Sequence, residues 1–493
     1  MYGFRDMEKI NVVWFKRDLR LKDHAPLKHA LEEGLPILLV YFVEPSLVRA
    51  SQSNIRHWKF IYESLVDLNQ SLAVVGGKIH LFHEEVIPAF EQIQQHYQLN
   101  KLFSHQETGI AITYQRDKEV KRFCQVNKVI WQEWQQNGVQ RGRKNRKGWS
   151  AQWETFMNRS LENPAWEKGD FLNPDFSEIS MMQKPLDWMK HSPFTLQQGG
   201  ENRAHQYLKS FLEGRVENYS RFISKPEASR RSCSRLSPYL AWGNLSVRQV
   251  FQAAESLRKA GKCTGPIRNF QSRLRWHCHF IQKFEMEERM EFEPINQGFM
   301  DYGYEENPEW LKAWKMGKTG IPLVDACMRC LIQTGYVNFR MRAMLVSFLT
   351  HHLNLDWRAG ADHLAQLFLD FEPGIHYPQL QMQAGVTGVN QVRIYNPIKQ
   401  SGDHDPEGVF IKKWVPELAS LPFPYFHEPW KTPPIEGQMA GFTLGDTYPF
   451  PIMDPEKAAR LAREKIWKAQ SLPDVKKEAK RILARHTLSL RWR

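Results

Sequence analysis

The hydrophobic pattern of this chain changes once, and that change limits the folds open to it. Over residues 1–135, short apolar runs rich in β-branched and aromatic residues alternate with stretches of helical periodicity. The runs occupy 10–15, 36–42 and 78–83, and the helical stretches occupy 24–33, 54–73 and 111–127. This alternation predicts an N-terminal α/β domain built on a doubly wound parallel sheet. No GxGxxG motif accompanies it, so the ordinary dinucleotide fingerprint is absent.

Beyond about residue 200 the pattern becomes helical, without alternating strands. Long helical stretches are predicted at 246–260, 268–289, 321–333 and 338–354. We therefore expect a large all-α domain over 201–493. Residues 136–200 are predicted to form a long connector, with five basic residues between Arg141 and Lys147. The basic segment 455–493 predicts an amphipathic helix pair, for which a solvated face and a nucleic-acid contact both remain open.

Length, charge and cysteine content narrow the class of protein. The chain has 493 residues, whereas single cores stop growing near roughly 250–300 residues. Lys and Arg (67) outnumber Asp and Glu (54), and this excess favours a polyanionic partner, nucleic acid first. No uncharged apolar stretch of about 18 residues occurs, so we predict no membrane span. Six cysteines do not make a disulfide scaffold in a chain of this size, and we expect a monomeric cytoplasmic protein.

Two motif-like stretches carry no chemistry. The sequence GKTG at 317–320 suggests a phosphate loop, but Lys312 stands where that motif needs a glycine. Cys327 and Cys330 form a CxxC inside a helical pattern, and no further cysteine follows. We therefore expect buried helix residues there and predict no metal site.

Three other clusters are more informative, although each has a structural alternative. Small hydroxyls beside an arginine at 234–240, just before a helix, can bind a phosphate or simply cap the helix. Asn338–Arg342 is followed some thirty residues later by Asp370–Glu372, which can provide a buried ion pair or hold a ribose hydroxyl. The chain also contains 17 tryptophans, which can fill a core, stack on bases or relay electrons.

Five long stretches, in this order, resemble the DNA photolyase/cryptochrome family. They are VVWFKRDLRLKDHAPL (12–27), SRLSPYLAWGNLSVRQV (234–250) and the segments 313–349, 355–374 and 392–418. The resemblance extends over nearly the whole chain. It implies an N-terminal antenna domain of α/β type and a C-terminal helical domain that holds FAD in a U-shaped conformation.

Position by position, the resemblance implies a set of cofactor-binding residues. Arg342 would pair with Asp370 beneath the isoalloxazine, and Glu372 matches a second family carboxylate. His376 stands where the family usually has asparagine or aspartate facing the flavin N5 atom. Glu107 matches a glutamate that binds a folate antenna in some members. The residues implied at the FAD phosphates and ribityl chain are Tyr219, Cys233, Ser234, Arg235, Leu236 and Ser237.

The resemblance also implies a lesion pocket, with departures from the family pattern. Trp276 matches a tryptophan that packs against a cyclobutane pyrimidine dimer. Arg273 replaces a glutamate that usually contacts the dimer, and Met382 replaces a lesion-packing tryptophan. Paired histidines typical of enzymes acting on (6-4) photoproducts are not evident around 338–342. The other residues implied at the DNA are Phe339, Arg340 and Gln400.

A chain of tryptophans usually carries electrons from the surface to the flavin in this family. Here Trp357 matches the middle position of that chain, and Tyr304 matches the outer position. The flavin-proximal position is Leu380, which has no accessible oxidised state. We therefore expect light reduction of the flavin by this route to be slow or absent.

Three functions follow from these observations. The first is light-driven DNA repair, in which reduced FAD passes an electron to a pyrimidine dimer flipped out of UV-damaged DNA. The second is a cryptochrome-type blue-light photoreceptor without repair turnover, which the changed Leu380, Met382 and Arg273 positions favour. The third is a flavin-free nucleotide binder related to electron-transfer flavoproteins, for which the resemblance of the helical half would have to be coincidence.

Overall fold

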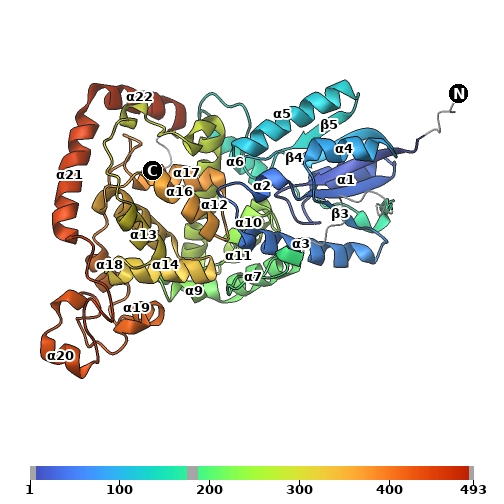
Figure 1. Ribbon diagram of the computed structural model, residues 1–493. Helices are drawn as coiled ribbons and strands as arrows, with labels where there is room; N and C mark the ends of the chain where they lie inside the picture. The colour runs from blue at the N-terminus through green and yellow to red at the C-terminus, as the bar shows by residue number, and fades with distance from the viewer. Residues whose placement is uncertain (1–6, 175–186, 488–493) are drawn as a thin grey trace.

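A computed structural model describes residues 7–174 and 187–487 of the chain. The α/β part and the helical part lie side by side, the former carrying the N-terminus (Figure 1). The predicted fold class is confirmed: a doubly wound parallel sheet followed by a large all-α part. No helix in the described ranges is long and apolar enough to cross a membrane.

The sheet has five parallel strands in the order β3-β2-β1-β4-β5. The strands are β1 (Lys9–Phe15), β2 (Ile37–Phe42), β3 (Ile79–Phe82), β4 (Gln98–His105) and β5 (Ile130–Trp134). In the central register Val13 lies between Leu39 and Phe103. The order reverses between β1 and β4, and in open parallel sheets ligands bind at the carboxyl ends of the strands beside such a switch point.

Three strands were predicted from the sequence, and two were missed. The predicted runs match β1, β2 and β3, whose side chains are almost all buried. β4 begins with the polar sequence QLNK, and β5 (IWQEW) is a partly exposed edge strand, so neither shows a continuous apolar run. The helices of this part are α1 (Ala25–Glu32), α2 (Pro45–Val48), α3 (Ile55–Ala73), α4 (Val86–Gln94) and α5 (Ala111–Val126).

The rest of the described chain is mostly helical. α6 (Trp149–Asn158) lies in the segment predicted to be a connector and packs against α11 of the helical part. After residue 200 the described chain forms isolated bridges but no strand. The helices are α7 (Glu201–Glu213), α8 (Tyr219–Phe222), α9 (Ser229–Ser232), α10 (Ser237–Ala241), α11 (Val247–Lys259), α12 (Thr264–Met286), α13 (Pro308–Met316), α14 (Pro322–Thr334), α15 (Phe339–Ser347), α16 (Trp357–Leu367), α17 (Pro373–Gln383), α18 (Pro397–His404), α19 (Val409–Trp414), α20 (Pro434–Met439), α21 (Pro455–Ser471) and α22 (Pro473–His486).

Each helix predicted from the sequence is present, and one of them is interrupted. The stretch predicted as one helix over 338–354 forms α15 and then a π-helical turn at Phe348–His352. The predicted basic helix pair is α21 and α22, while its last residues, 488–493, lie outside the described chain. The GKTG sequence forms the turn between α13 and α14, where Gly317 ends α13 in the left-handed region (φ 62°).

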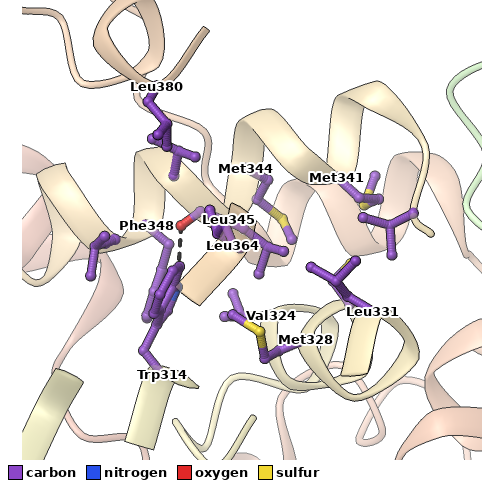
Figure 2. Close-up of a cluster of buried hydrophobic side chains, with 14 of the residues drawn as sticks. Trp314, Val324, Met328, Leu331, Met341, Met344, Leu345, Phe348, Leu364 and Leu380 are labelled. Carbon is purple, nitrogen blue, oxygen red and sulfur yellow. Dashed lines mark hydrogen bonds between the residues drawn. The ribbon is translucent and has the colours of Figure 1, made fainter. Parts of the chain in front are cut away.

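The core of the helical part lies directly beneath a cavity. Trp314 is fully buried, and its indole N–H donates to the Leu345 carbonyl (3.2 Å), the bond dashed in Figure 2. Met328 of α14 and Met344 of α15 fill the space beside it, and Cys327 and Cys330 are buried in α14. The core residues that also line the cavity are Val346, Leu364, Phe368, Phe371 and Leu380.

Candidate cofactor and nucleic-acid site

The cavity in the helical part has a volume of about 90 Å³ and is lined by α15, the end of α16, the following loop and α17. α17 packs along α12, and a Cβ at Gly374 would lie 2.7 Å from the Ile281 Cα, so only glycine permits this approach. Apolar side chains form most of the wall. The polar side chains that reach it include Arg342, Asp370, Glu372 and His376.

Arg342 and Asp370 form a bidentate ion pair in this wall. The two guanidinium nitrogens Nη1 and Nη2 donate to the carboxylate oxygens at 3.0 and 2.9 Å, and Arg342 Nε donates to the Val337 carbonyl at 2.9 Å. Burial alone would raise the pKa of Asp370, but the charge of Arg342 holds that pKa below its ordinary value. The Asp370 carboxylate is therefore ionised at neutral pH, and the pair is fixed in one geometry.

Glu372 is the second carboxylate and begins α17. It accepts a hydrogen bond from the Gly374 amide (3.3 Å), and Arg17 of the α/β part lies 3.5 Å from its Oε2. Burial raises the pKa of Glu372 to about 7, although Arg17 opposes the shift. Glu372 can therefore change its charge near neutral pH.

His376 lines the same cavity, one turn into α17. Its Nε2 lies 3.0 Å from the Ala361 carbonyl, and its ring packs edge-on against Phe371. Burial lowers the pKa of His376 to about 4, so the ring is neutral at pH 7. Because a carbonyl can only accept, Nε2 carries the proton, and Nδ1 is left with a lone pair.

The Cys233–Ser237 segment does not line the cavity but is linked to it. The Ser237 hydroxyl hydrogen-bonds Asp370, and Arg235 stacks on Tyr336 (3.8 Å), whose ring also lies 5.8 Å from Arg342. Arg235 adopts a left-handed backbone conformation (φ 58°) just before α10. Buried Tyr219 lies close by, packed against Phe211 and Phe270, and hydrogen-bonds Arg273.

Unpartnered polar atoms around this segment fit a polar ligand. Arg235 Nε and Asn338 Oδ1 are buried and find no hydrogen-bond partner among the described residues. Buried polar groups are otherwise paired almost without exception. A guanidinium N–H can donate to a phosphate, and an amide oxygen can accept from a ribityl hydroxyl of a dinucleotide cofactor.

Of the six residues expected at the DNA, three are exposed and three are half-buried. Trp276 is 47% exposed on α12, and Phe339 is 51% exposed where α15 begins at the cavity. Arg340 lies 3.5 Å from Gln400 of α18. Arg273 is exposed on α12, whereas Met382 is half-buried on α17 and does not line the cavity.

Trp357 and Leu380 belong to the core beside the cavity. Trp357 is buried at the start of α16, and Leu380 lines the cavity from α17. Tyr304 is half-buried, and its hydroxyl is enclosed without a hydrogen-bond partner. Burial holds the pKa of Tyr304 well above its ordinary value.

A second cavity, of about 100 Å³, opens at the carboxyl ends of β1 and β2. Its walls carry the aromatic rings of Trp14 and Trp58 together with Glu107. Arg116 binds Glu107 and Glu44 at 2.7 Å each, and burial raises the pKa of Glu44 to about 7. The Glu107 carboxylate is thus held in place by a buried guanidinium.

Asp18, His24 and His105 form a buried cluster beside the switch point. Asp18 Oδ2 lies 2.7 Å from His105 Nδ1 and 3.1 Å from His24 Nε2. His24 Nδ1 accepts from the Leu27 amide (3.1 Å), so in the neutral ring the proton must sit on Nε2, which faces Asp18. This tautomer has no lone pair at Nε2 for a metal, and the three side chains pack as a buried cluster in which His105 hydrogen-bonds Asp18.

Sequence reasoning missed several residues of the site. Tyr336 joins the Arg235 and Arg342 guanidinium groups, and Arg17 reaches the cavity wall from the α/β part. His277 is held neutral by burial, which lowers its pKa to about 4, although the nearby Asp370 carboxylate opposes that shift. Arg17 lies within the quoted stretch 12–27, but nothing in that stretch indicates its distant partner.

An α/β part joined to a helical part, with an ion pair in the wall of a largely apolar cavity, fits a protein that binds a cofactor between its helices. Known proteins agree with this class. The family model "DNA photolyase" matches residues 11–158, and the model "FAD binding domain of DNA photolyase" matches residues 270–468. The chain therefore belongs to the DNA photolyase and cryptochrome family, and it carries that family's FAD-binding domain.

Relatives of both kinds occur at similar identity. A deoxyribodipyrimidine photo-lyase of Agrobacterium fabrum is 29% identical over 488 residues, covering 92% of this chain and 96% of the relative. A cryptochrome DASH of Gloeobacter violaceus is 28% identical over 506 residues, covering 94% and 96%. The crystal structure of a class III photolyase from Agrobacterium tumefaciens superposes with a TM-score of 0.80 at 25% identity, covering 96% of this chain and 100% of that one. The match to an FAD-binding domain removes the flavin-free alternative.

Proposed function

We propose that the protein is a light-driven DNA repair enzyme that splits cyclobutane pyrimidine dimers in UV-damaged DNA. The observation that carries this proposal is the cavity wall with the Arg342–Asp370 pair, opening beside the exposed Phe339. Bound FAD would supply the photochemistry and the transferred electron. Arg342, Asp370 and Glu372 would hold the isoalloxazine side of the cofactor. The segment Cys233–Ser237, together with Tyr219, would hold its phosphate and ribityl side.

The protein's own part is to bind, orient and exclude water. The fixed Arg342–Asp370 charges need no rearrangement when the cofactor's charge changes. His376 and the apolar wall keep the cavity dry, and neutral His376 offers Nδ1 as an acceptor. A dimer must leave the helix stack to reach such a cavity, and a damaged base step costs least to unstack.

A basic loop beside Trp276 supports the DNA partner. Arg146 of the connector donates to the His279 carbonyl (3.2 Å) and stacks on Trp149, and the His279 ring lies 5.1 Å from the Trp276 ring. The loop is thus fixed next to Trp276, with Lys144 and Lys147 exposed to solvent. Exposed cations around an exposed aromatic ring are typical of nucleic-acid contacts.

We expect Trp276→Ala to lose about 1–3 kcal/mol of affinity for dimer-containing DNA through lost stacking. Flavin content should hardly change, because Trp276 does not line the cavity. The measurement is a fluorescence-anisotropy titration with damaged and undamaged oligonucleotides of one sequence. Trp467→Ala, which removes a tryptophan 73% exposed on α21, is the matched control. An equal loss for undamaged DNA would assign Trp276 to general backbone binding and contradict its proposed role.

A blue-light photoreceptor without repair turnover is the second candidate. It is favoured by Leu380, Met382 and Arg273, which stand where family members with repair activity have other side chains. One property distinguishes the two functions, since only the repair enzyme splits pyrimidine dimers catalytically under light. A protein that binds flavin and responds to light but turns over no dimer would be the photoreceptor.

The route of flavin reduction follows from the core around Trp357. Leu380 leaves a gap at the cavity, and the enclosed Tyr304 hydroxyl has no hydrogen-bond partner among the described residues that could take its phenolic proton. We therefore expect Trp357→Phe to photoreduce its flavin with a thiol donor at nearly the wild-type rate. The rate is followed by the loss of flavin absorbance under blue light. Abolished photoreduction in this variant would make Trp357 a working relay member despite Leu380.

The second cavity suits an antenna chromophore. Its tryptophan rings can stack on a planar ring system, and the fixed Glu107 carboxylate can accept hydrogen bonds from amino groups such as those of a pterin. We therefore propose a folate-type antenna there, with Glu107 as its polar contact. Its presence would be tested by the absorption of the purified protein after the flavin has been removed.

A further inference from the structure

The segment Leu367–Glu372 separates the two cavities and belongs to both. Its Asp370 and Glu372 carboxylates line the flavin cavity. Phe371 lines that cavity and also the second cavity at the end of β1. The wall between the two spaces is therefore one residue thick at Phe371, and whatever fixes this segment fixes the two carboxylates of the flavin site.

Side chains from outside the segment bind four of its backbone carbonyls. The donors come from β1's following loop, from α3 and from the end of α10, so three of the four belong to the α/β part. The contacts are Arg56 Nη1 to Leu367 O (2.8 Å), His57 Nε2 to Phe368 O (3.0 Å), Trp242 Nε1 to Leu369 O (2.8 Å) and Arg17 Nη2 to Phe371 O (2.6 Å).

Arg17 binds the segment at two residues. Besides the Phe371 carbonyl it reaches Glu372, with Nη1 3.5 Å from Oε2, and its guanidinium stacks on the Trp242 ring at 4.4 Å. Its own backbone is clamped, because Gln136 Nε2 donates to the Arg17 carbonyl at 2.5 Å. Gly243 lies so close that an added Cβ would be 2.1 Å from that carbonyl. The guanidinium is thus presented in a fixed position.

His57 extends the same support toward α16. Its ring is buried between Trp242 and Phe371, with ring centres 5.6 and 6.1 Å away. Because Nε2 faces a carbonyl oxygen, it must carry the ring proton and donate. Burial lowers the pKa of His57 to about 3, so the ring stays neutral in this role at physiological pH.

We propose that Arg17 and His57 are positioning residues of the flavin site, supplied by the α/β part to hold Asp370 and Glu372 in register. The inference rests on the assignment of FAD to the cavity above. A segment held by four fixed donors loses little freedom when the cofactor binds. Displacing Asp370 and Glu372 from these positions should therefore weaken flavin binding. Loosening the Arg17 contact would also change the charge state of Glu372, which faces Lys16, Arg17, His105 and Glu107 around a small adjoining cavity.

The test compares Arg17→Gln, Arg17→Lys and Arg122→Gln in the purified flavin-loaded protein. Arg122 is an exposed arginine of α5 and serves as the matched control. Retained FAD is measured by equilibrium dialysis over a dilution series, and the visible circular dichroism of bound FAD reports its geometry. We expect Arg17→Gln to weaken flavin binding at least tenfold and to change the dichroism, Arg17→Lys to weaken it less, and Arg122→Gln to match the wild type.

A pH series separates positioning from a general loss of stability. Removing the Arg17 charge takes away an opposite charge beside Glu372, which raises the pKa of that carboxyl further. The inflection in flavin affinity should therefore move to higher pH in Arg17→Gln and stay near its wild-type position in Arg17→Lys. Should Arg17→Gln fail to fold, the dichroism and affinity of Arg17→Lys carry the test.

The outcomes separate this inference from the proposed function. Wild-type affinity, dichroism and pH inflection in both Arg17 variants would overturn the positioning role while leaving the proposed function intact. A wild-type protein that binds FAD but repairs no dimer would overturn the repair function and leave the Arg17 result to stand. A wild-type protein without affinity for FAD would overturn both.

Discussion

Asp370→Asn should release most of the flavin and destabilise the helical part. The substitution keeps the shape of the side chain but removes the charge that two Arg342 nitrogens bind at 3.0 and 2.9 Å. Breaking a buried pair costs about 3–5 kcal/mol, and we expect the lower end because the Arg342 side chain keeps 23% of its exposure. The measurements are the FAD-to-protein ratio after purification and the free energy of unfolding in urea.

Asp403→Asn provides the control for this variant. Asp403 is exposed on α18, so its loss removes the same charge away from the cavity. It should leave both flavin content and stability unchanged. If Asp370→Asn instead purifies with full flavin occupancy and unfolds like the wild type, the ion pair does not organise the flavin site.

The protein should lose stability steeply as the pH falls from about 6.5 to about 4. Burial lowers the pKa of His57 and His105 to about 3 and that of five further histidines to about 4. In this pH window the unfolded chain binds protons at these histidines and the folded chain does not, so the free energy of unfolding drops as the pH falls. The five histidines are His277, His351, His352, His363 and His376.

Three buried carboxyls act in the opposite direction over the same window. Burial raises the pKa of Glu44, Glu291 and Glu372 to about 7, so the folded chain binds their protons first as the pH falls. Their protonation raises the free energy of unfolding as the pH falls from about 7 to their unfolded pKa near 4.5. Seven histidines against three carboxyls leave a net loss toward acid.

A buried histidine and an exposed control histidine allow this acid effect to be tested. His352 is buried in the π-helical turn, stacked on Phe348 with ring centres 5.2 Å apart, next to His351 and near the charge of Arg463. His352→Leu should flatten the loss of unfolding free energy between pH 6.5 and 4, whereas His96→Gln, at an exposed position, should not. The free energy comes from urea unfolding at each pH. A wild-type stability that is constant or rises toward pH 4 would refute the argument.

The fold was largely readable from residue periodicity, and its failures have physical causes. β2 is an unbroken apolar run of six buried residues, so its signal is strong. β5 lies at the sheet edge with partly exposed side chains, which leaves no apolar run to recognise. The 338–354 stretch keeps helical periodicity, because a π-helical turn with i→i+5 hydrogen bonds over only five residues is too short to shift that periodicity visibly.

The site divides in the same way into local and long-range features. Residue patterns alone suggested that a buried arginine near 340 would need a carboxylate near 370, and the bidentate Arg342–Asp370 contact has that form. Arg17 and Phe371 are 354 residues apart, and their contact depends on how the α/β part docks against α17. A contact of this kind leaves no trace in the spacing or periodicity of either segment.

The most direct test of the repair function is photochemical. The purified protein, with its flavin reduced, is illuminated with blue light in the presence of an oligothymidylate that contains cyclobutane dimers, and the thymine absorbance band is followed. We predict that absorbance recovers with many turnovers per protein under light and not in the dark. No recovery on single-stranded or double-stranded dimer substrates, by a protein that has retained its FAD, would contradict repair and make the photoreceptor function the better account.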